Sequence, residues 1–347
     1  MFYRAPPDIK LKSIIVSRTD KIGDLILSIP AFATLRSMYP DATISVLVRN
    51  YNYDIVKSLP CIDEAIAIDS YSDDELKTKI RKLKADAFVA LYSDAKVLKL
   101  CRMSQAAIKV GPLSKAGSFF VYSHGIRQRR SESVKNEAQY NLDLIKRLNT
   151  RLFDKCGISM QKINIDESCY CHIDAYLKDE HIDRFVLVHP FFGGSAKNYT
   201  TDEYLCVLKR LLALKDNIDI VVSAIEADAP VAKEMAAKLG PRAHVYISKG
   251  SILNLAALID RCCVYVGGST GPSHIAGNLK KKSVLIYPGK ATQSPVRWGQ
   301  YLNDKAIYIV PDAKEQDKDY SSNVFACVDK TLLENTALAI SEAADEC

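Results

Sequence analysis

Short apolar runs alternate with helical patterns along most of the chain. Residues 13–17 form a β-branched run, and after a polar turn the apolar positions from Asp24 to Met38 recur at helical spacing. β-branched runs of this length are typical of strands, whereas a repeat of about 3.6 residues predicts a helix. We therefore predict a strand followed by a helix at the start of the chain.

The same alternation continues in two series. The first series has predicted strands at 13–17, 43–48, 65–68 and 87–91 and predicted helices at 24–38, 73–84 and 134–148. The second series has predicted strands at 184–189, 218–223, 243–247, 263–266 and 283–287 and predicted helices at 201–214, 229–239, 251–260 and 272–278. Strands that alternate with helices at this spacing predict an α/β fold with parallel sheets covered on both faces.

The chain length indicates two domains, because 347 residues exceed the roughly 250–300 that one hydrophobic core usually serves. We predict an N-terminal Rossmann-like domain at 1–165, a C-terminal Rossmann-like domain at 166–322 and a closing helix at 323–347. Parallel α/β sheets bind ligands at the carboxyl ends of their strands. Two such domains are therefore expected to face an interdomain cleft.

Two stretches interrupt the alternation. Residues 153–183 have little periodicity and are expected to hold the crossover between domains. Residues 111–133 are rich in Gly, Pro, Ser and basic side chains, which is long for a structureless loop and indicates function or mobility. Their basic run contains Arg127, Arg129 and Arg130 and is either a solvated loop or a contact for acidic headgroups or a phosphorylated sugar.

Composition narrows the class of protein. Hydrophobic residues make up 48% and charged residues 25%, values that indicate a soluble globular protein. No apolar run approaches the roughly 18 residues of a membrane span and the N-terminus does not resemble a signal peptide, so we expect a cytoplasmic protein. The ten cysteines show no metal-type spacing and are expected to be reduced thiols, and a net charge of +6 does not indicate a nucleic-acid partner.

The first segment with candidate chemistry follows the first strand. Residues 18–24 read Arg-Thr-Asp-Lys-Ile-Gly-Asp, and Gly23 is expected to allow a tight turn. Asp24 falls at the start of a helix, where exposed amides favour an acidic side chain. Asp24 is therefore either a helix cap or a general base directed into the cleft.

Two further segments offer anion-binding groups. After the strand that ends at His189, two glycines precede Ser195 and Lys197, which offer a hydroxyl donor and a positive charge for a phosphate, although a surface lysine would look the same. Residues 266–274 read as strand, Gly-rich turn and helix, so the groups of Ser269, Thr270 and Gly271 are expected to surround one anion. His274 is either a polar anchor or a phosphate contact.

Several of these segments resemble one known family. Residues 20–30 are similar to the N-terminal signature of the heptosyltransferases, glycosyltransferase family 9, and residues 269–276 are similar to their C-terminal signature. His189-Pro190 with Lys197, residues 249–259 and Tyr287-Pro288-Gly289 also look like family landmarks, in the same order. The resemblance covers roughly residues 13–300.

The resemblance implies the two-domain GT-B architecture and inverting transfer of a sugar, typically heptose from ADP-heptose, to a lipid-linked lipopolysaccharide core. Asp24 matches the family's catalytic base, Lys197 the lysine on the donor diphosphate, and Thr270 with Gly271 the turn around those phosphates. Glu226 is similar to the acid that contacts the nucleotide ribose. Peripheral contact with the inner face of the cytoplasmic membrane is a hypothesis that rests on the lipid-linked acceptors and the basic residues of 111–130.

One position departs from the family pattern and leaves the donor open. Many members have an aspartate two residues before Gly271, where this chain has Ser269, and that acid is associated with binding the donor sugar. Another nucleotide sugar such as a UDP-hexosamine, a nucleotide-sugar epimerase and a non-catalytic nucleotide-sugar binding protein are the alternatives. No cofactor or metal is expected, because the Asp-x-Asp at 317–319 lies in a charged segment and reads as solvated.

Overall fold

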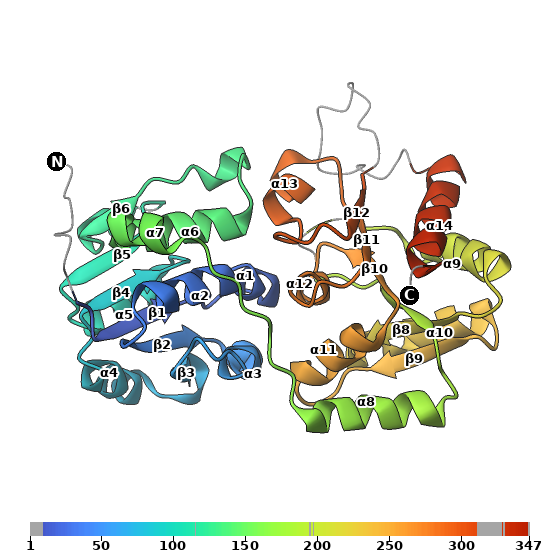
Figure 1. The fold of residues 1–347 in the computed structure, drawn as a ribbon, viewed down its shortest axis with the longest axis horizontal. Coiled ribbons are helices and arrows are strands. Elements are labelled where there is room, and N and C mark those ends of the chain that lie inside the picture. Colours follow the sequence, from blue (N-terminus) through green and yellow to red (C-terminus); the bar gives the residue numbers. More distant parts are fainter. Residues whose placement is uncertain are drawn as a thin grey trace. The chain divides into compact units, whose positions relative to one another are not determined.

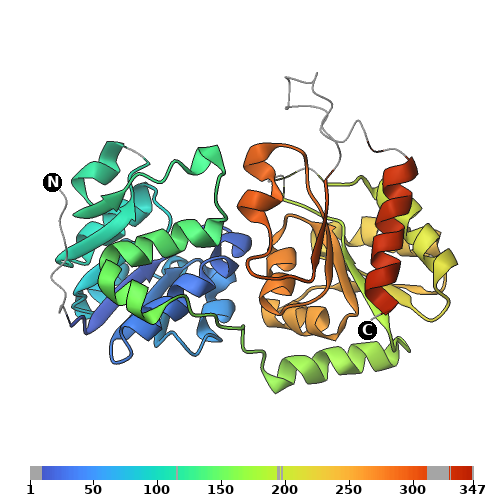
Figure 2. The ribbon, with the colours of Figure 1, turned by 45° about the horizontal axis from the view of Figure 1, so that its top comes forward.

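The structure is a computed structural model that describes residues 10–114, 116–193, 196, 198–310, 328 and 330–345. The chain divides into two compact units, Met1–Asn164 and Ile165–Cys347. Each unit contains one six-stranded sheet, and the strand pairs in both sheets are parallel (Figures 1 and 2). The predicted α/β class with two Rossmann-like units is confirmed.

The first unit has the strand order β3-β2-β1-β4-β5-β6. Its strands are β1 Ser13–Ser17, β2 Thr43–Val48, β3 Glu64–Ala67, β4 Ala87–Ala90, β5 Ile108–Pro112 and β6 His124–Ile126. Its α-helices are α1 Ile22–Ile26, α2 Ile29–Met38, α3 Tyr53–Lys57, α4 Asp73–Lys82, α5 Ala95–Met103, α6 Glu137–Leu148 and α7 Thr150–Cys156, and its 3-10 turns are η1 Asn50–Asn52, η2 Ile68–Ser70, η3 Ala116–Phe120 and η4 Arg130–Glu132.

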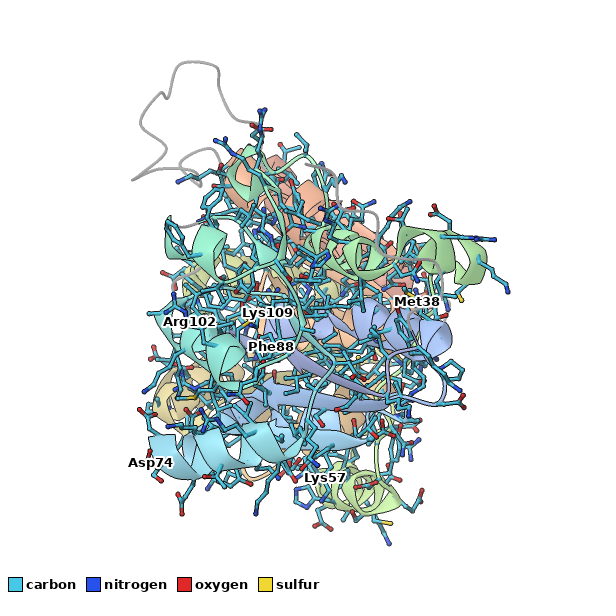
Figure 3. The ribbon with its side chains drawn as sticks, turned by 90° about the vertical axis from the view of Figure 1, so that its left-hand side faces the viewer. Met38, Lys57, Asp74, Phe88, Arg102 and Lys109 are labelled. Carbon is cyan, nitrogen blue, oxygen red and sulfur yellow. The ribbon has the colours of Figure 1, made fainter. Side chains whose placement is uncertain are left out.

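Burial follows the layers of this unit. Phe88 of β4 is fully buried in the sheet, whereas Asp74 of α4 and Arg102 of α5 lie exposed on covering helices (Figure 3). All four residues of β4 are buried, as expected for a central parallel strand with helices on both faces. The sheet core therefore fixes the strand ends from which the polar loops emerge.

The second unit has the strand order β12-β11-β10-β7-β8-β9. Its strands are β7 Phe185–His189, β8 Asp219–Ala224, β9 Ala243–Ile247, β10 Val264–Gly268, β11 Ser283–Ile286 and β12 Ala306–Ile309. Its α-helices are α8 Glu167–Asp179, α9 Thr201–Leu214, α10 Ala229–Leu239, α11 Ile252–Arg261, α12 Gly271–Asn278, α13 Pro295–Trp298 and α14 Lys330–Asp345, and its 3-10 turns are η5 Glu226–Asp228 and η6 Ala291–Gln293.

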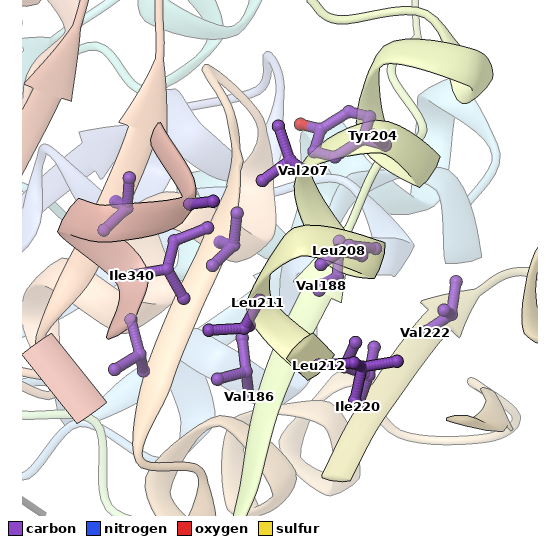
Figure 4. Close-up of a cluster of buried hydrophobic side chains, with 14 of the residues drawn as sticks. Val186, Val188, Tyr204, Val207, Leu208, Leu211, Leu212, Ile220, Val222 and Ile340 are labelled. Carbon is purple, nitrogen blue, oxygen red and sulfur yellow. The ribbon is translucent and has the colours of Figure 1, made fainter. Parts of the chain in front are cut away.

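The core of the second unit joins its last helix to its first strands. Leu208 and Leu211 of α9 and Ile340 of α14 pack in one buried cluster with Val186 and Val188 of β7 (Figure 4). Burying a side chain of this size contributes about 1.5–3 kcal/mol. The C-terminal helix is thus part of the second unit's own core.

Both sheets have the same topological switch point. In the first unit β1 lies between β2 and β4, and in the second β7 lies between β8 and β10. In open α/β sheets, neighbouring strands whose connections run in opposite directions, here β1 with β4 and β7 with β10, commonly bind ligands beyond their carboxyl ends. Ligand-binding groups are therefore expected in the loops after β1 and β4 and in those after β7 and β10.

The structure corrects three expectations about local structure. The helix predicted at 24–38 is two helices, α1 and α2. Pro30 has no N–H to donate to the Ile26 carbonyl, so α1 ends before it, and α2 begins with Pro30 in its first turn. The segment at 111–133, in which no strand or helix was predicted, contains β6, which pairs with β5. The segment at 153–183 contains most of α7 and all of α8.

Cysteine chemistry also departs from expectation at one position. Cys263 is disulfide-bonded, so the prediction that all ten cysteines are reduced thiols is wrong there. Seven other cysteines in the described ranges are free. Among the described residues, no helix has both the length and the apolar character needed to cross a membrane.

Candidate active site

Asp24 lies at the switch point of the first unit, in the first turn of α1. It makes no side-chain cap for that helix, so the cap interpretation is wrong. Instead the guanidinium of Arg18 donates from Nη2 to Asp24 Oδ1 at 2.6 Å, and the Asp24 side chain keeps 17% of its surface exposed. An accessible, oriented carboxylate at a strand end can accept a proton from a bound hydroxyl.

Gly23 does not make the expected tight turn. It lies within α1 and is buried, and it is absent from the described residues that have a positive φ. Its backbone is therefore ordinary helix, and the short segment 18–21 makes the turn between β1 and α1 instead.

Asp20 is a second carboxylate on the same cation. Its Oδ1 lies 2.7 Å from Arg18 Nε, and its backbone carbonyl accepts hydrogen bonds from the Tyr51 hydroxyl and the Asn52 amide. Burial raises the pKa of Asp20, Arg18 opposes that change and Asp24 adds to it, which leaves a pKa of about 7. The loop after β1 therefore holds one carboxyl group that titrates near neutral pH.

This raised pKa predicts how stability depends on pH. A carboxyl group whose folded pKa lies above its unfolded value stabilises the fold fully below the unfolded pKa, and that contribution is lost as pH rises through the folded pKa. For Asp20 the window runs from about 4 to about 7. We therefore expect the melting temperature of the wild type minus that of Asp20→Asn to increase when pH is lowered from 8 to 5. A constant difference between the two proteins would contradict the raised pKa.

The basic run after β6 is not one patch. Arg130 is only 19% exposed and donates to Glu137 Oε1 at 2.5 Å and to the Leu91 carbonyl at 3.0 Å. Arg129 is exposed and pairs at 3.4 Å with Glu132, and Arg127 is exposed. Arg130 is thus built into the first unit, whereas Arg127 and Arg129 remain at its surface, where they are predicted to face the acceptor.

Close backbone approaches explain the glycines at the switch point of the second unit. A Cβ on Gly268 would lie 2.7 Å from the Asn198 side chain, and one on Gly267 would lie 2.9 Å from the His189 carbonyl oxygen. Asn198 Oδ1 accepts from the Tyr204 hydroxyl and the Tyr199 amide, which fixes the loop after β7. The loop after β7 therefore packs against the end of β10, beside the turn at 269–271 where the sequence predicted anion binding.

The turn after β10 presents a short polar surface at the start of α12. Ser269, Thr270 and Gly271 are partly exposed, and Ser273 closes the turn by accepting from the Thr270 amide at 3.2 Å and donating to its carbonyl at 2.7 Å. A helix N-terminus of this kind favours an anion through its amides and its dipole. The turn can therefore offer hydrogen-bond donors to an anion, and phosphate binding here stays a prediction.

His274 lies deeper than a surface ligand. It is 4% exposed, and burial lowers its pKa to about 4, so it is neutral at pH 7. Nδ1 of His274 has no hydrogen-bond partner among the described residues. Its proposed contact with a phosphate therefore stays a prediction, and that contact would be made by a neutral ring.

Of the remaining residues predicted to bind the donor, the structure describes only Glu226. Glu226 lies in η5 after β8, is exposed and pairs with Lys249 at 3.2 Å, so it is a surface carboxylate at a strand end. Ser195, Lys197 and the Asp-x-Asp at 317–319 lie outside the described residues. Within the described ranges, no three His, Cys, Asp or Glu side chains are placed as a metal site.

The structure adds two residues that the sequence had not singled out. Arg18 and Glu137 are each 1% exposed, and Glu137 Oε1 accepts from both Nη1 and Nη2 of Arg18 at 3.2 Å. An arginine directly after an apolar strand was the available signal, because a buried guanidinium requires counter-charges. Glu137 gave no such signal, since a glutamate at the start of a helix is ordinary.

Comparisons with known proteins agree with these features. The model of glycosyltransferase family 9 (heptosyltransferase) matches residues 75–328. A Haemophilus influenzae protein named "Putative glycosyltransferase" is 27% identical over 328 residues, covering 89% of this chain and 92% of that protein. Lipopolysaccharide heptosyltransferase 3 of Escherichia coli is 21% identical over 280 residues, covering 76% of this chain and 79% of its own.

A solved structure supports the fold. The glycosyl transferase family 9 structure from Veillonella parvula superposes with a TM-score of 0.82 at 17% identity, covering 97% of this chain and 98% of that one. Since the family model spans well over half of the sequence, the resemblance carried by the two signatures is confirmed. The chain belongs to glycosyltransferase family 9, the heptosyltransferase family.

Proposed function

We propose that this protein is an inverting, metal-independent heptosyltransferase that moves heptose from ADP-heptose to a lipid-linked lipopolysaccharide or lipooligosaccharide core. The observation that carries the proposal is the Asp24 carboxylate, which Arg18 holds at the carboxyl end of β1 with part of its surface accessible. Family membership favours transfer over the epimerase and the non-catalytic binding protein.

Asp24 is proposed as the general base. In inverting transfer the acceptor hydroxyl attacks the anomeric carbon, its proton passes to a carboxylate, and the bond between the sugar and the diphosphate breaks. Arg18 orients the Asp24 carboxylate through one oxygen, which leaves the other for the acceptor hydroxyl. Arg127 and Arg129 are proposed to contact anionic groups of the acceptor, which would be presented at the inner face of the cytoplasmic membrane.

The second unit is proposed to bind the donor. The departing diphosphate needs positive charge or hydrogen-bond donors, since negative charge builds on it as the bond breaks. The N-terminus of α12 with Thr270 and Gly271 supplies donors, and Lys197 supplies the charge. Ser195, Ser269 and His274 are proposed to complete the phosphate contacts, and Glu226 is proposed to bind the ribose.

Two of the similar proteins support ADP-heptose as the proposed donor. One curated relative is a lipopolysaccharide heptosyltransferase, and a structural neighbour with a TM-score of 0.76 at 15% identity is the ADP-heptose heptosyltransferase II of E. coli, covering 96% of this chain and 98% of that one. Ser269 stands where many family members have an acid. A UDP-hexosamine is therefore the alternative donor that the test includes.

Thermal stabilisation by nucleotides tests the donor site. A ligand bound only by the native state at 100 times its Kd stabilises by about 2.7 kcal/mol, which corresponds to several degrees in melting temperature for a unit of this size. We expect such a shift with ADP and ADP-heptose and a much smaller one in Lys197→Ala. The matched control is Lys238→Ala, which removes an exposed lysine paired with Glu234 on α10.

Two results would change the proposal. A shift with UDP-sugars alone would replace ADP-heptose as the donor and leave the site in place. No shift with any nucleotide or nucleotide sugar would contradict the donor site itself.

A further inference from the structure

One buried guanidinium serves three carboxylates in the first unit. Arg18 contacts Asp20 at 2.7 Å, Asp24 at 2.6 Å and Glu137 at 3.2 Å. It also donates to the Leu91 carbonyl after β4 and to Asn141 Oδ1 of α6, at 3.2 and 3.0 Å. The loop after β1, the end of β4 and the start of α6 are therefore joined through a single side chain.

The carboxylate of Glu137 is not needed to start its helix. Asn136 already caps α6 by accepting from the Ala138 amide at 3.0 Å, and Gln139 accepts from the Asn136 amide at 2.9 Å. Removing a carboxylate from water costs several kcal/mol unless cations compensate it. Glu137 bears that cost between two guanidinium groups, those of Arg18 and Arg130.

Glu137 and Asp24 share one donor atom. Arg18 Nη2 donates to Asp24 Oδ1 at 2.6 Å and to Glu137 Oε1 at 3.2 Å. A neutral side chain at 137 would leave Nη2 paired with Asp24 alone, and a carboxylate held in a tighter ion pair is a poorer proton acceptor. The charge at position 137 thereby acts on Asp24 without touching it.

We propose that Glu137 is a positioning residue for Asp24, acting through the shared Arg18 guanidinium, and that Arg130 sets how strongly Glu137 competes for that guanidinium. This inference rests on the proposed function, in which Asp24 is the general base. Arg130 draws Glu137 away from Arg18, so removing Arg130 and removing the charge of Glu137 have opposite consequences for Asp24.

The other charged and titratable groups around Asp24 fit this arrangement. Asp20 lies on the same loop, Tyr51 faces the cluster from η1, and Tyr92 faces it from the segment after β4. Burial is the largest cause that raises the pKa of both tyrosines, so both stay neutral at pH 7. The groups that can carry charge around Asp24 are therefore two arginines, Arg18 and Arg130, and three carboxyl groups, those of Asp20, Asp24 and Glu137.

The test compares Glu137→Gln and Arg130→Gln by the pH profile of transfer from ADP-heptose to lipopolysaccharide core. Loss of a negative charge in Glu137→Gln is expected to move the acidic limb of kcat/KM to lower pH and to lower kcat about tenfold with an unchanged donor KM. Loss of a positive charge in Arg130→Gln is expected to move the acidic limb to higher pH. The control is Asp143→Asn, on the outer face of the same helix, where Lys135 pairs with Asp143 at 2.9 Å.

Limbs that stay in place, or that move in the same direction in both variants, would overturn the inference. If Glu137→Gln does not fold, Arg130→Gln alone decides, because Arg130 is only partly buried and the direction in which the acidic limb of kcat/KM moves in that variant tests the inference.

If the wild type does not turn over ADP-heptose, the proposed donor has failed, and melting temperatures of Asp24→Asn, Glu137→Gln and the double variant decide instead. Non-additive losses would support the shared guanidinium, and additive losses would overturn it.

Discussion

Asp24→Asn is expected to lower the rate of sugar transfer by about 10²–10⁴-fold, the usual contribution of a positioned general base. The amide keeps the shape of the side chain but cannot accept the acceptor's proton. ADP binding should be unchanged, because the proposed diphosphate groups belong to the second unit. The measurement is kcat with ADP-heptose and lipopolysaccharide core, together with the melting-temperature shift caused by ADP.

A surface carboxylate in the same unit provides the control for this loss. Asp154 of α7 is 56% exposed and pairs with Lys146 at 2.6 Å, so Asp154→Asn should leave transfer within twofold of the wild type. If Asp24→Asn retained transfer within a few-fold of the wild type, Asp24 would not be the base. In that case the nearby carboxylate of Asp20 would be the next residue to examine.

Most strands could be predicted because their sequences leave few alternatives, although β5, β6 and β12 were not predicted. Residues 13–17 and 43–48 are predicted and observed with identical bounds, since β-branched runs buried on both faces favour central parallel strands. The helix α8 was missed because only Cys169 and Ile173 of its thirteen residues are buried. Two apolar positions one turn apart give too weak a periodic signal.

The candidate site was predictable only where its residues are neighbours in sequence. Asp24 lies in the first turn of the helix after β1, the turn at 269–271 directly follows β10, and both strands lie at the switch points of their sheets. The contact between Arg18 and Glu137 joins positions 119 residues apart, and only the packing of α6 beside β4 and β5 brings them together. The sequence also could not show that Arg130, within an exposed basic run, points inward to Glu137.

Arg18→Met is expected to have the largest effect on stability of any substitution considered. It leaves the carboxylates of Asp20, Asp24 and Glu137 without their shared cation, and breaking a buried ion pair by removing one partner costs about 3–5 kcal/mol. Burial lowers the pKa of Arg18 and the three carboxylates raise it, with a net rise, so this cation is charged at every accessible pH.

Amide hydrogen exchange of β1 and α6 measures this loss within the first unit, where opening should become at least about 100-fold more frequent in Arg18→Met. Arg49→Met is the control, because Arg49 is 44% exposed and its pair with Asp69 is expected to contribute at most about 1 kcal/mol. The difference between Arg18→Met and the wild type should shrink as pH falls from 8 to 5, since Asp20, whose pKa is about 7, takes up a proton and no longer needs the cation. Equal exchange in the two arginine variants, or a difference that does not change with pH, would show that the three carboxylates are not held by Arg18 in solution.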